Sequence, residues 1–247
     1  KMNNNQATIS KMKEMRLHGM AQAFQTTLEA GMNEKFTLDE LLSHLVDSEW
    51  DERNSRKRDR LRRAAGFRYM AAFEDLDFDH NRKLDKNMML RLSDCRWIEE
   101  HKDILITGPT GVGKSYIASA LGHQACDQGW KVLYYLAGRL FGILKEAKRD
   151  GSYTKILTKI EKTDLLILED FGLSPLNNES RLSLMDILED RHGRKSTIFI
   201  SQLPVSTWHG LIGESTIADA IMDRIVYGSY RIELNGESFR KKMYQKS

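Results

Sequence analysis

The sequence predicts an α/β domain with a parallel sheet covered by helices on both faces, preceded by a small all-helical domain. Before residue 100, apolar residues recur at helical spacing and no strand-like run occurs. After residue 101, the short apolar runs "DILIT", "KVLYYL", "LLIL" and "TIFIS" alternate with stretches long enough for helical crossovers. A glycine-rich stretch, "GPTGVGKS", follows the first of these runs and precedes a helical pattern.

The helical domain is predicted at residues 1–78, with a linker region at 79–100. Gly31 is expected to end one helix, and Thr37 and Glu40 have the spacing of a capping box at the start of the next. The apolar residues of that second helix form one stripe, which consists of Leu38, Leu41, Leu42, Leu45 and Val46. The α/β domain is predicted at 101–247, and its last strand, "YRIEL", alternates as an edge strand does.

Composition places the chain among folded proteins that do not span a membrane. It has 247 residues, of which 40% are hydrophobic and 30% charged, with only three prolines. No apolar run approaches the roughly 20 residues needed to cross a bilayer, and no charged-then-apolar leader is present, so a cytoplasmic location is expected. The two cysteines, Cys95 and Cys126, lack metal-ligand spacing and are expected to lie reduced in the interior.

The glycine-rich stretch matches the phosphate-binding pattern GxxxxGK[ST] at every fixed position. Glycines let such a loop point its backbone N–H groups at phosphate oxygens, and the following helix adds its positive N-terminal end. Lys114 can reach the β- and γ-phosphates of ATP, and the Ser115 hydroxyl can complete a Mg²⁺ shell. The predicted nucleotide-binding residues are Gly108, Pro109, Thr110, Gly111, Val112, Gly113, Lys114, Ser115 and Tyr116.

A pair of acids, Glu169 and Asp170, ends the apolar run "LLILED". A phosphate-binding loop needs an acidic site on a neighbouring strand end, which holds Mg²⁺ and orients the attacking water. We therefore interpret Glu169 as the acid on the metal side, together with Ser115, and Asp170 as the acid that orients water. The alternative is a pair of acids at an exposed strand end.

These motifs resemble the AAA+ ATPases, in the clade that holds the helicase loader DnaC and the IstB family of insertion-sequence helpers. The resemblance to the IstB family extends over essentially the whole chain, through the helical start, "GPTGVGKS", "LLILEDFGLSPL", "SQLPVSTWHGLIG", "IADAIMDRI" and "YRIELNGESFRKK". It implies an AAA+ fold, ATP hydrolysis and a working form that is a homo-oligomer.

The resemblance also implies three further contacts to the nucleotide, from Gln202, Arg224 and Arg240. Gln202 would lie near the γ-phosphate as the first sensor, with Ser201 as the competing choice. Arg224 matches the arginine finger, which reaches the nucleotide of a neighbouring subunit. The alternative for Arg224 is an ion pair on the helix surface with Asp219 or Asp223.

Two features depart from the family pattern. The family places Asp where this chain has Glu169, and one extra methylene moves the carboxylate outward by ~1.5 Å. A bridging water could absorb that difference, but if the carboxylate is misplaced, Glu169→Asp is expected to raise ATPase activity. Arg240 aligns with the second sensor, and the chain after it is too short for a full helical lid, so the C-terminal lid is expected to be largely absent.

Basic residues are concentrated in two segments. Eight arginines or lysines lie between Arg53 and Arg68 against one interior acid, Asp59, which favours a DNA-binding surface over a solvated charged face. The candidate DNA contacts in this segment are Arg53, Arg56, Lys57, Arg58, Arg60, Arg62 and Arg63. In the second segment they are Lys145, Lys148, Arg149 and Lys155. No aromatic-rich stacking platform accompanies them, so largely sequence-independent duplex binding is preferred.

Three functions fit these features. The first is an ATP-dependent transposition regulator that oligomerises on duplex target DNA, hydrolyses ATP with stimulation by DNA, and recruits or stimulates a partner transposase. The second is a DnaC-like replicative helicase loader, and the third is a small-molecule kinase. The basic segment and the length of the resemblance to the IstB family favour the first, with ATP and Mg²⁺ as cofactors.

Overall fold

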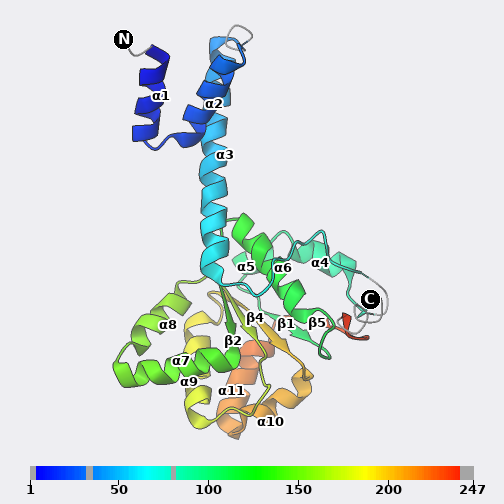
Figure 1. Ribbon diagram of the computed structural model, residues 1–247. Coiled ribbons are helices and arrows are strands. Elements are labelled where there is room, and N and C mark those ends of the chain that lie inside the picture. The colour runs from blue at the N-terminus through cyan, green and yellow to red at the C-terminus, as the bar shows by residue number, and fades with distance from the viewer. Residues whose placement is uncertain (1–3, 32–35, 79–81, 240–247) are drawn as a thin grey trace. The chain divides into compact units, whose positions relative to one another are not determined.

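The computed structural model describes residues 4–31, 36–78 and 82–239, and its chain divides into two compact units, Lys1–Arg60 and Leu61–Ser247 (Figure 1). Each unit is described separately below. The N-terminal helices are α1 (Asn4–Glu14), α2 (His18–Glu29) and α3 (Leu38–Ala65). The remaining elements are α4 (Lys86–Leu92), α5 (Arg96–Glu99), β1 (Ile104–Thr107), α6 (Lys114–Asp127), β2 (Val132–Leu136), α7 (Ala137–Asp150), α8 (Tyr153–Glu161), β3 (Leu165–Glu169), α9 (Asn178–Arg191), β4 (Ser196–Ser201), η3 (Val205–Thr207), α10 (Trp208–Ile212), α11 (Ser215–Val226) and β5 (Tyr230–Glu233).

In the first unit, α2 packs against α3 at a glycine. A Cβ atom on Gly19 would overlap the backbone carbonyl oxygen of Ser48, so only glycine permits this approach of the two helices. At the next position along each helix, the backbone N–H of Met20 donates to Oε2 of Glu49 at 3.2 Å. Leu45 is buried on the same stretch of α3. The contact therefore combines a close backbone approach with one satisfied buried carboxylate.

Helix α3 begins with the predicted capping box. The backbone N–H of Thr37 donates to Oε2 of Glu40 at 2.8 Å, and the N–H of Glu40 donates back to Oγ1 of Thr37 at 3.3 Å. The predicted apolar stripe lies on this helix, but Leu38 is 82% exposed and Val46 is 49% exposed. None of the described helices, the 28-residue α3 included, is long and apolar enough to cross a membrane.

The second unit is built on a five-stranded sheet in the order β2-β3-β4-β1-β5, in which all neighbouring strands are parallel. Strand β1 lies between β4 and β5, so Ile106 lies opposite both Ile200 and Ile232. Among the described strands, β5 pairs with β1 alone, and it is exposed at three of its four residues, as predicted for an edge strand. The predicted parallel sheet is thus confirmed.

Helices cover both faces of this sheet, which explains its continuous apolar strands (Figure 1). One core lies between the sheet and the side with α4, α5 and α6, and the other lies between the sheet and α7 to α11. Successive residues of β3 alternate between them, because Ile167 belongs to the first core and Leu168 to the second. Both are fully buried. The three-layer α/β fold class predicted from the sequence is confirmed.

Residues 79–100, predicted as a linker region, contribute two short helices to the second unit. Asp85 caps α4 by accepting from the N–H groups of Asn87 and Met88. Met89 of α4 and Trp97 of α5 are buried in the core beside α6. Helices of seven and four residues are shorter than the window in which a helical period can be recognised, so the sequence did not reveal them.

The two cysteines lie in the interior as free thiols, as predicted. Both Cys95 and Cys126 are buried in the core beside α6. Burial raises the pKa of each thiol to about 12, because the charged thiolate is poorly solvated there. Neither thiol is therefore in the reactive thiolate form near neutral pH.

The segment after α3 is anchored to the second unit through a glycine of α6. The Phe67 ring lies against Gly122, where a Cβ atom would collide with it and would also come within 3.0 Å of Ile167 Cδ1. The same ring packs against the His123 ring at a tilt of 35° with centroids 4.2 Å apart, and it meets Tyr134 edge-on at 6.2 Å. A mid-helix glycine, unfavourable by propensity, is thus explained by the ring that occupies its side-chain position.

We expect Gly122→Ala to lower the free energy of unfolding by about 1 kcal/mol, because the clash with Phe67 outweighs the gain in helix propensity. Gly142→Ala is the matched control, since Gly142 lies in α7 with open space around it. That control should raise the free energy of unfolding by up to ~1 kcal/mol. Urea unfolding followed by circular dichroism measures both, and equal effects of the two substitutions would contradict the proposed packing of Phe67.

Candidate nucleotide-binding site

The predicted site residues gather at the carboxyl ends of three neighbouring strands. The glycine-rich loop follows β1, Glu169 is the last residue of β3, and Ser201 is the last residue of β4. In open parallel sheets, ligands bind in the crevice outside these strand ends. The sheet order therefore brings together segments that are about 60 and 90 residues apart in the sequence.

Glycines give the loop at Gly108–Ser115 its shape. Gly108 has φ 143°, and the space a Cβ would need there is taken by the backbone carbonyl oxygen of Leu234. Gly113 has φ 93° and is the residue from which α6 starts. A helix N-terminus reached through left-handed glycines presents backbone N–H groups to an anion. The loop and its helix therefore form a phosphate-binding concavity.

Lys114 is held inside this loop. Its Nζ donates to the carbonyl oxygens of Gly108 at 2.7 Å and Pro109 at 2.8 Å, and the residue is 7% exposed. Burial lowers the pKa of Lys114, while the nearby carboxylates of Asp170 and Glu169 oppose that shift. An ammonium group has three N–H donors, so two of them fix its position and the third is available to a phosphate oxygen.

Glu169 is buried, and partners from three other segments of the chain hold its carboxylate. The Ser115 hydroxyl and the Arg68 guanidinium both donate to Oε1, the latter at 3.2 Å. The Tyr134 hydroxyl donates to Oε2 at 2.7 Å. Burial and this hydrogen bond raise the pKa of Tyr134, so the phenol remains a donor. The longer side chain of glutamate thus has a specific partner, the hydroxyl on β2.

Asp170 and Gln202 lie at the same end of the sheet. Asp170 has φ 57°, a left-handed conformation that is uncommon for residues other than glycine and that often occurs at functional sites. Gln202 accepts through Oε1 from the Thr110 hydroxyl at 2.7 Å, which connects the end of β4 to the loop. Ser201 is buried, donates to the Phe171 carbonyl and accepts from a backbone N–H, so its hydroxyl is already used. Of the two predicted sensor candidates, the geometry favours Gln202.

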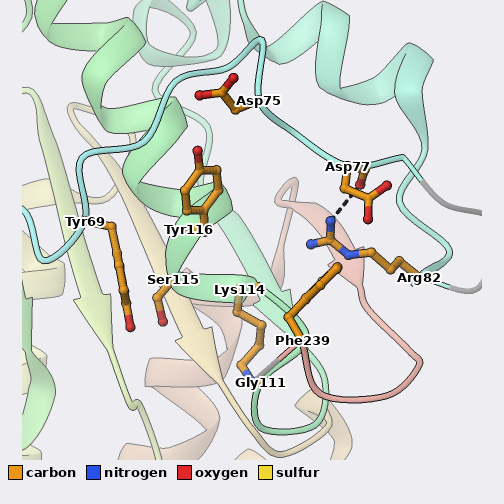
Figure 2. A pocket seen from close by; sticks show the side chains of 10 residues that line it. Tyr69, Asp75, Asp77, Arg82, Gly111, Lys114, Ser115, Tyr116 and Phe239 are labelled. Carbon is orange, nitrogen blue, oxygen red and sulfur yellow. Dashed lines mark hydrogen bonds between the residues drawn. The ribbon is translucent and has the colours of Figure 1, made fainter. Parts of the chain in front are cut away.

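A cavity of about 370 Å³ opens beside the loop (Figure 2). The predicted residues Lys114, Ser115 and Tyr116 line it from α6. Tyr69 lies beside Ser115 and Phe239 beside Lys114 in this view, and both also line the cavity. Aromatic walls next to a phosphate-binding loop match the flat faces of a nucleoside base. Neither residue was predicted as a site residue: Tyr69 lies outside the recognised motifs, and Phe239 lies within "YRIELNGESFRKK", where only Arg240 was predicted to contact the nucleotide.

Arg82 supports the wall of this cavity and was also missed. The side chain is buried and donates to the backbone carbonyls of Asp77 at 2.6 Å and Val112 at 2.8 Å. Its guanidinium lies 4.5 Å from the centroid of the Phe239 ring. Phe239 in turn donates its backbone N–H to the carbonyl of Gly111 at 3.0 Å. Arg82 thereby joins three segments around the loop.

The two predicted arginine contacts to nucleotide have different outcomes. Arg224 lies on α11, where it forms an ion pair with Glu189 at 3.5 Å and donates to the Ala220 carbonyl at 3.0 Å. Its acidic partner is therefore on α9 and is neither Asp219 nor Asp223. Arg240, and with it the segment where a C-terminal lid would begin, lies outside the described residues.

Several predicted DNA-binding arginines have acidic partners within the chain. Arg53 pairs with Glu49 and Arg56 with Glu52, each at 2.6 Å. In the second unit, Arg62 pairs with Asp127, also at 2.6 Å, and Arg63 is exposed. The basic side chains that are exposed and form no ion pair with another described residue in this segment are Lys57, Arg58 and Arg60.

The second basic segment lies on α7 and α8. Lys145 pairs with Glu179 at 3.5 Å and Arg149 with Glu146 at 3.1 Å. The Lys148 ammonium lies 4.6 Å from the centroid of the Tyr153 ring. Lys155 is exposed on α8. These positions remain candidates for DNA contact.

Fold and site together define a P-loop nucleotide-binding domain of the AAA+ class. The solved structure of the DnaC helicase loader superposes on the chain with a TM-score of 0.57, over 68% of this chain and 98% of that one, at 20% identity. The chain belongs to the family of IstB-like ATP binding proteins, whose family model matches residues 10–247.

Two curated relatives cover nearly the whole chain. An insertion-sequence ATP-binding protein from Sinorhizobium fredii is 45% identical over 97% of this chain and 98% of its own length. The ATP-binding protein of insertion sequence IS1162 from Pseudomonas fluorescens is 41% identical over 85% of this chain and 91% of its own length. The predicted membership of the IstB family is confirmed.

The sequence led us to expect higher ATPase activity in Glu169→Asp. The hydrogen bond from Tyr134 on β2 to Glu169 predicts the opposite effect. Glu169→Asp withdraws the carboxylate from the buried Tyr134 hydroxyl and leaves that donor unpaired, so we expect steady-state ATPase activity to fall. Tyr134→Phe in the same chain removes the unpaired donor and should recover part of the loss, which makes the pair of changes a double-mutant cycle. Higher ATPase activity in Glu169→Asp alone would show that the glutamate is misplaced.

Proposed function

We propose that this protein is an ATPase that acts in the transposition of an insertion sequence, and that it assembles on duplex DNA and serves a partner transposase. The observation that carries the ATPase proposal is the hydrogen bond between the loop residue Ser115 and the strand-end acid Glu169. The names of the relatives from Sinorhizobium fredii and Pseudomonas fluorescens support the association with insertion sequences.

The cavity and the loop would divide the nucleotide between them. The triphosphate would lie on the loop N–H groups and the third donor of Lys114. The nucleoside would enter the adjoining cavity, where Tyr69 and Tyr116 offer aromatic faces. The exposed carboxylates of Asp75 and Asp77 line the same cavity and can accept from hydroxyl or amino groups.

The residues present also fit a magnesium ion. Ser115 and Glu169 bring a hydroxyl and a carboxylate oxygen together at the end of the loop, and oxygen is the donor that Mg²⁺ prefers. When bound with nucleotide, the ion would neutralise charge on the β- and γ-phosphates. Water and phosphate oxygens would complete its shell.

Hydrolysis requires an attacking water and compensation of charge on the γ-phosphate. We assign orientation of the water to Asp170. This residue directly follows the buried strand β3 and has a left-handed backbone conformation. The Gln202 amide would donate to the γ-phosphate, since its oxygen is already bound to Thr110. Arg224 would complete the site of a neighbouring subunit after leaving its half-exposed ion pair with Glu189.

A mixing experiment tests the shared site. Lys114→Ala should lose nucleotide binding, because the charge inside the phosphate loop is lost. Arg224→Ala should bind ATP but hydrolyse it at least about 10³-fold more slowly. Equimolar mixtures of the two inactive variants should regain ATPase activity, since some interfaces pair an intact loop with an intact Arg224. Mixed oligomers without activity would place Arg224 outside the site, and unchanged nucleotide affinity in Lys114→Ala would refute the assignment of the loop.

The exposed cations of the first unit are the proposed duplex-binding surface. Lys57, Arg58 and Arg60 are at successive or near-successive positions of α3, and their charges are not compensated by ion pairs with other described residues. Cations of this kind bind phosphates without reading sequence, and binding releases counterions. Arrangement of many subunits along one duplex would multiply a weak contact.

Replacement of Lys57, Arg58 and Arg60 by alanine should flatten the dependence of log affinity on log salt by about 0.9 per lost phosphate contact. The matched control replaces Lys102, Lys131 and Arg194. These three exposed cations precede β1, β2 and β4, at the amino-terminal ends of the strands and away from the carboxyl ends that form the candidate nucleotide site. Fluorescence anisotropy across a salt series should show an unchanged slope for the control. Equal slopes for both triple variants would remove this surface from the DNA interface.

The same assay separates transposition from helicase loading. A transposition ATPase should prefer duplex over single-stranded DNA and bind more tightly with ATP than with ADP. A preference for single strands would favour a helicase loader instead.

A further inference from the structure

The ion pair between Arg68 and Glu169 lies within the proposed nucleotide site, but no motif accounts for it. Arg68 follows the end of α3 and reaches across the fold to a strand-end acid 101 residues away, with 3.2 Å between Nη1 and Oε1. The arginine side chain is 47% exposed, whereas the glutamate side chain is 3% exposed. The negative charge of Glu169 raises the pKa of Arg68. The ion pair therefore joins a half-exposed arginine side chain to a buried glutamate side chain.

The two carboxylate oxygens of Glu169 accept hydrogen bonds from different partners, and these partners differ in how readily they can be exchanged. Oε2 accepts from the hydroxyl of Tyr134, a buried residue. Oε1 accepts from Arg68 and from Ser115, and Ser115 is the residue that ends the phosphate loop. Oε1 is consequently the oxygen that can exchange its partner without exposing a buried donor.

On the proposed function, Ser115 and Glu169 would hold a nucleotide-bound Mg²⁺ through the hydroxyl and Oε1. A divalent cation at this oxygen would weaken the hydrogen bond from the guanidinium, because the two positive charges repel each other. We propose that Arg68 is a positioning residue that holds Oε1 of Glu169 while the site is empty, and that it yields this oxygen when nucleotide binds together with Mg²⁺. This inference rests on the function proposed above.

The neighbours of Arg68 allow this exchange without movement of the backbone. On one side, the Phe67 ring is packed against Gly122 and against the His123 ring. On the other, the carbonyl oxygen of Tyr69 lies 3.1 Å from Nε2 of His123. The backbone of Arg68 is thus fixed at both ends, and only its half-exposed side chain is free to turn.

The guanidinium already has a second contact while it pairs with Glu169. Its central carbon lies 5.5 Å from the centroid of the Tyr69 ring, within the range of a cation–π contact. Tyr69 lines the proposed nucleoside cavity. A guanidinium released from Glu169 would therefore remain beside the nucleotide and could compensate phosphate charge when no metal is present.

The experiment measures binding of a fluorescent ADP analogue to the full chain, once with excess Mg²⁺ and once with excess EDTA. For Arg68→Gln we expect the ratio of the two affinities, Mg²⁺ over EDTA, to rise about three- to tenfold over wild type. Binding in Mg²⁺ should tighten because no cation competes for Oε1, whereas binding in EDTA should weaken because a positive charge is lost. Arg68→Lys keeps the charge and should return the ratio toward the wild-type value.

Arg96→Gln is the matched control, because Arg96 is an exposed arginine of the same unit that pairs with Asp94. Its ratio should equal that of wild type. A ratio in Arg68→Gln that is unchanged or reduced, with circular dichroism equal to wild type, would overturn the inference and leave the proposed ATPase intact. If Arg68→Gln does not fold, a wild-type ratio in folded Arg68→Ala or a raised ratio in Arg68→Lys would also overturn it. Failure of the wild-type chain to bind the analogue in either buffer would refute the proposed function, and the inference with it.

Discussion

The carboxylate of Glu169 is the point on which the arrangement of this site depends. A buried carboxylate is costly unless hydrogen bonds or charges compensate it, and here the compensation comes from Ser115, Tyr134 and Arg68. These partners belong to the phosphate loop, to β2 and to the segment after α3. One charge at the tip of β3 therefore fixes three parts of the chain relative to each other.

Sequence reasoning found the parts of this site that are coded locally. The loop at Gly108–Ser115 can be recognised because each glycine and the lysine have a required spacing, and Glu169 and Asp170 because acids at the tip of an apolar strand have no packing role. Tyr134 and Arg68 could not be found in this way. Their roles depend on which residue lies opposite them in the folded chain, at separations of 35 and 101 residues.

The basic segment from Arg53 to Arg68 shows a second limit of sequence reasoning, because here the sequence suggested more uncompensated charge than the structure has. Counted in sequence, the run from Arg53 to Arg68 contains one interior acid, which favours a surface of free positive charge. In the structure, Arg53 pairs with Glu49, just outside the run and one helical turn away. Arg62 and Arg68 pair with acids that are distant in sequence. Charge density along the chain thus overestimates free charge on the surface, because acids outside the counted window supply the partners.

In the tripeptide Phe67–Tyr69, the two outer residues hold the backbone in place and the middle residue contacts the buried acid Glu169. Phe67 needs a close approach to a helix, which only a glycine at position 122 permits. Tyr69 needs its carbonyl near His123 and its ring at the cavity. Arg68, between them, points to the buried acid. Because the flanking residues fix the backbone, the exchangeable contact can be made by a long side chain whose movement leaves the core undisturbed. This division explains why a half-exposed arginine can share an oxygen with the most buried acid of the site.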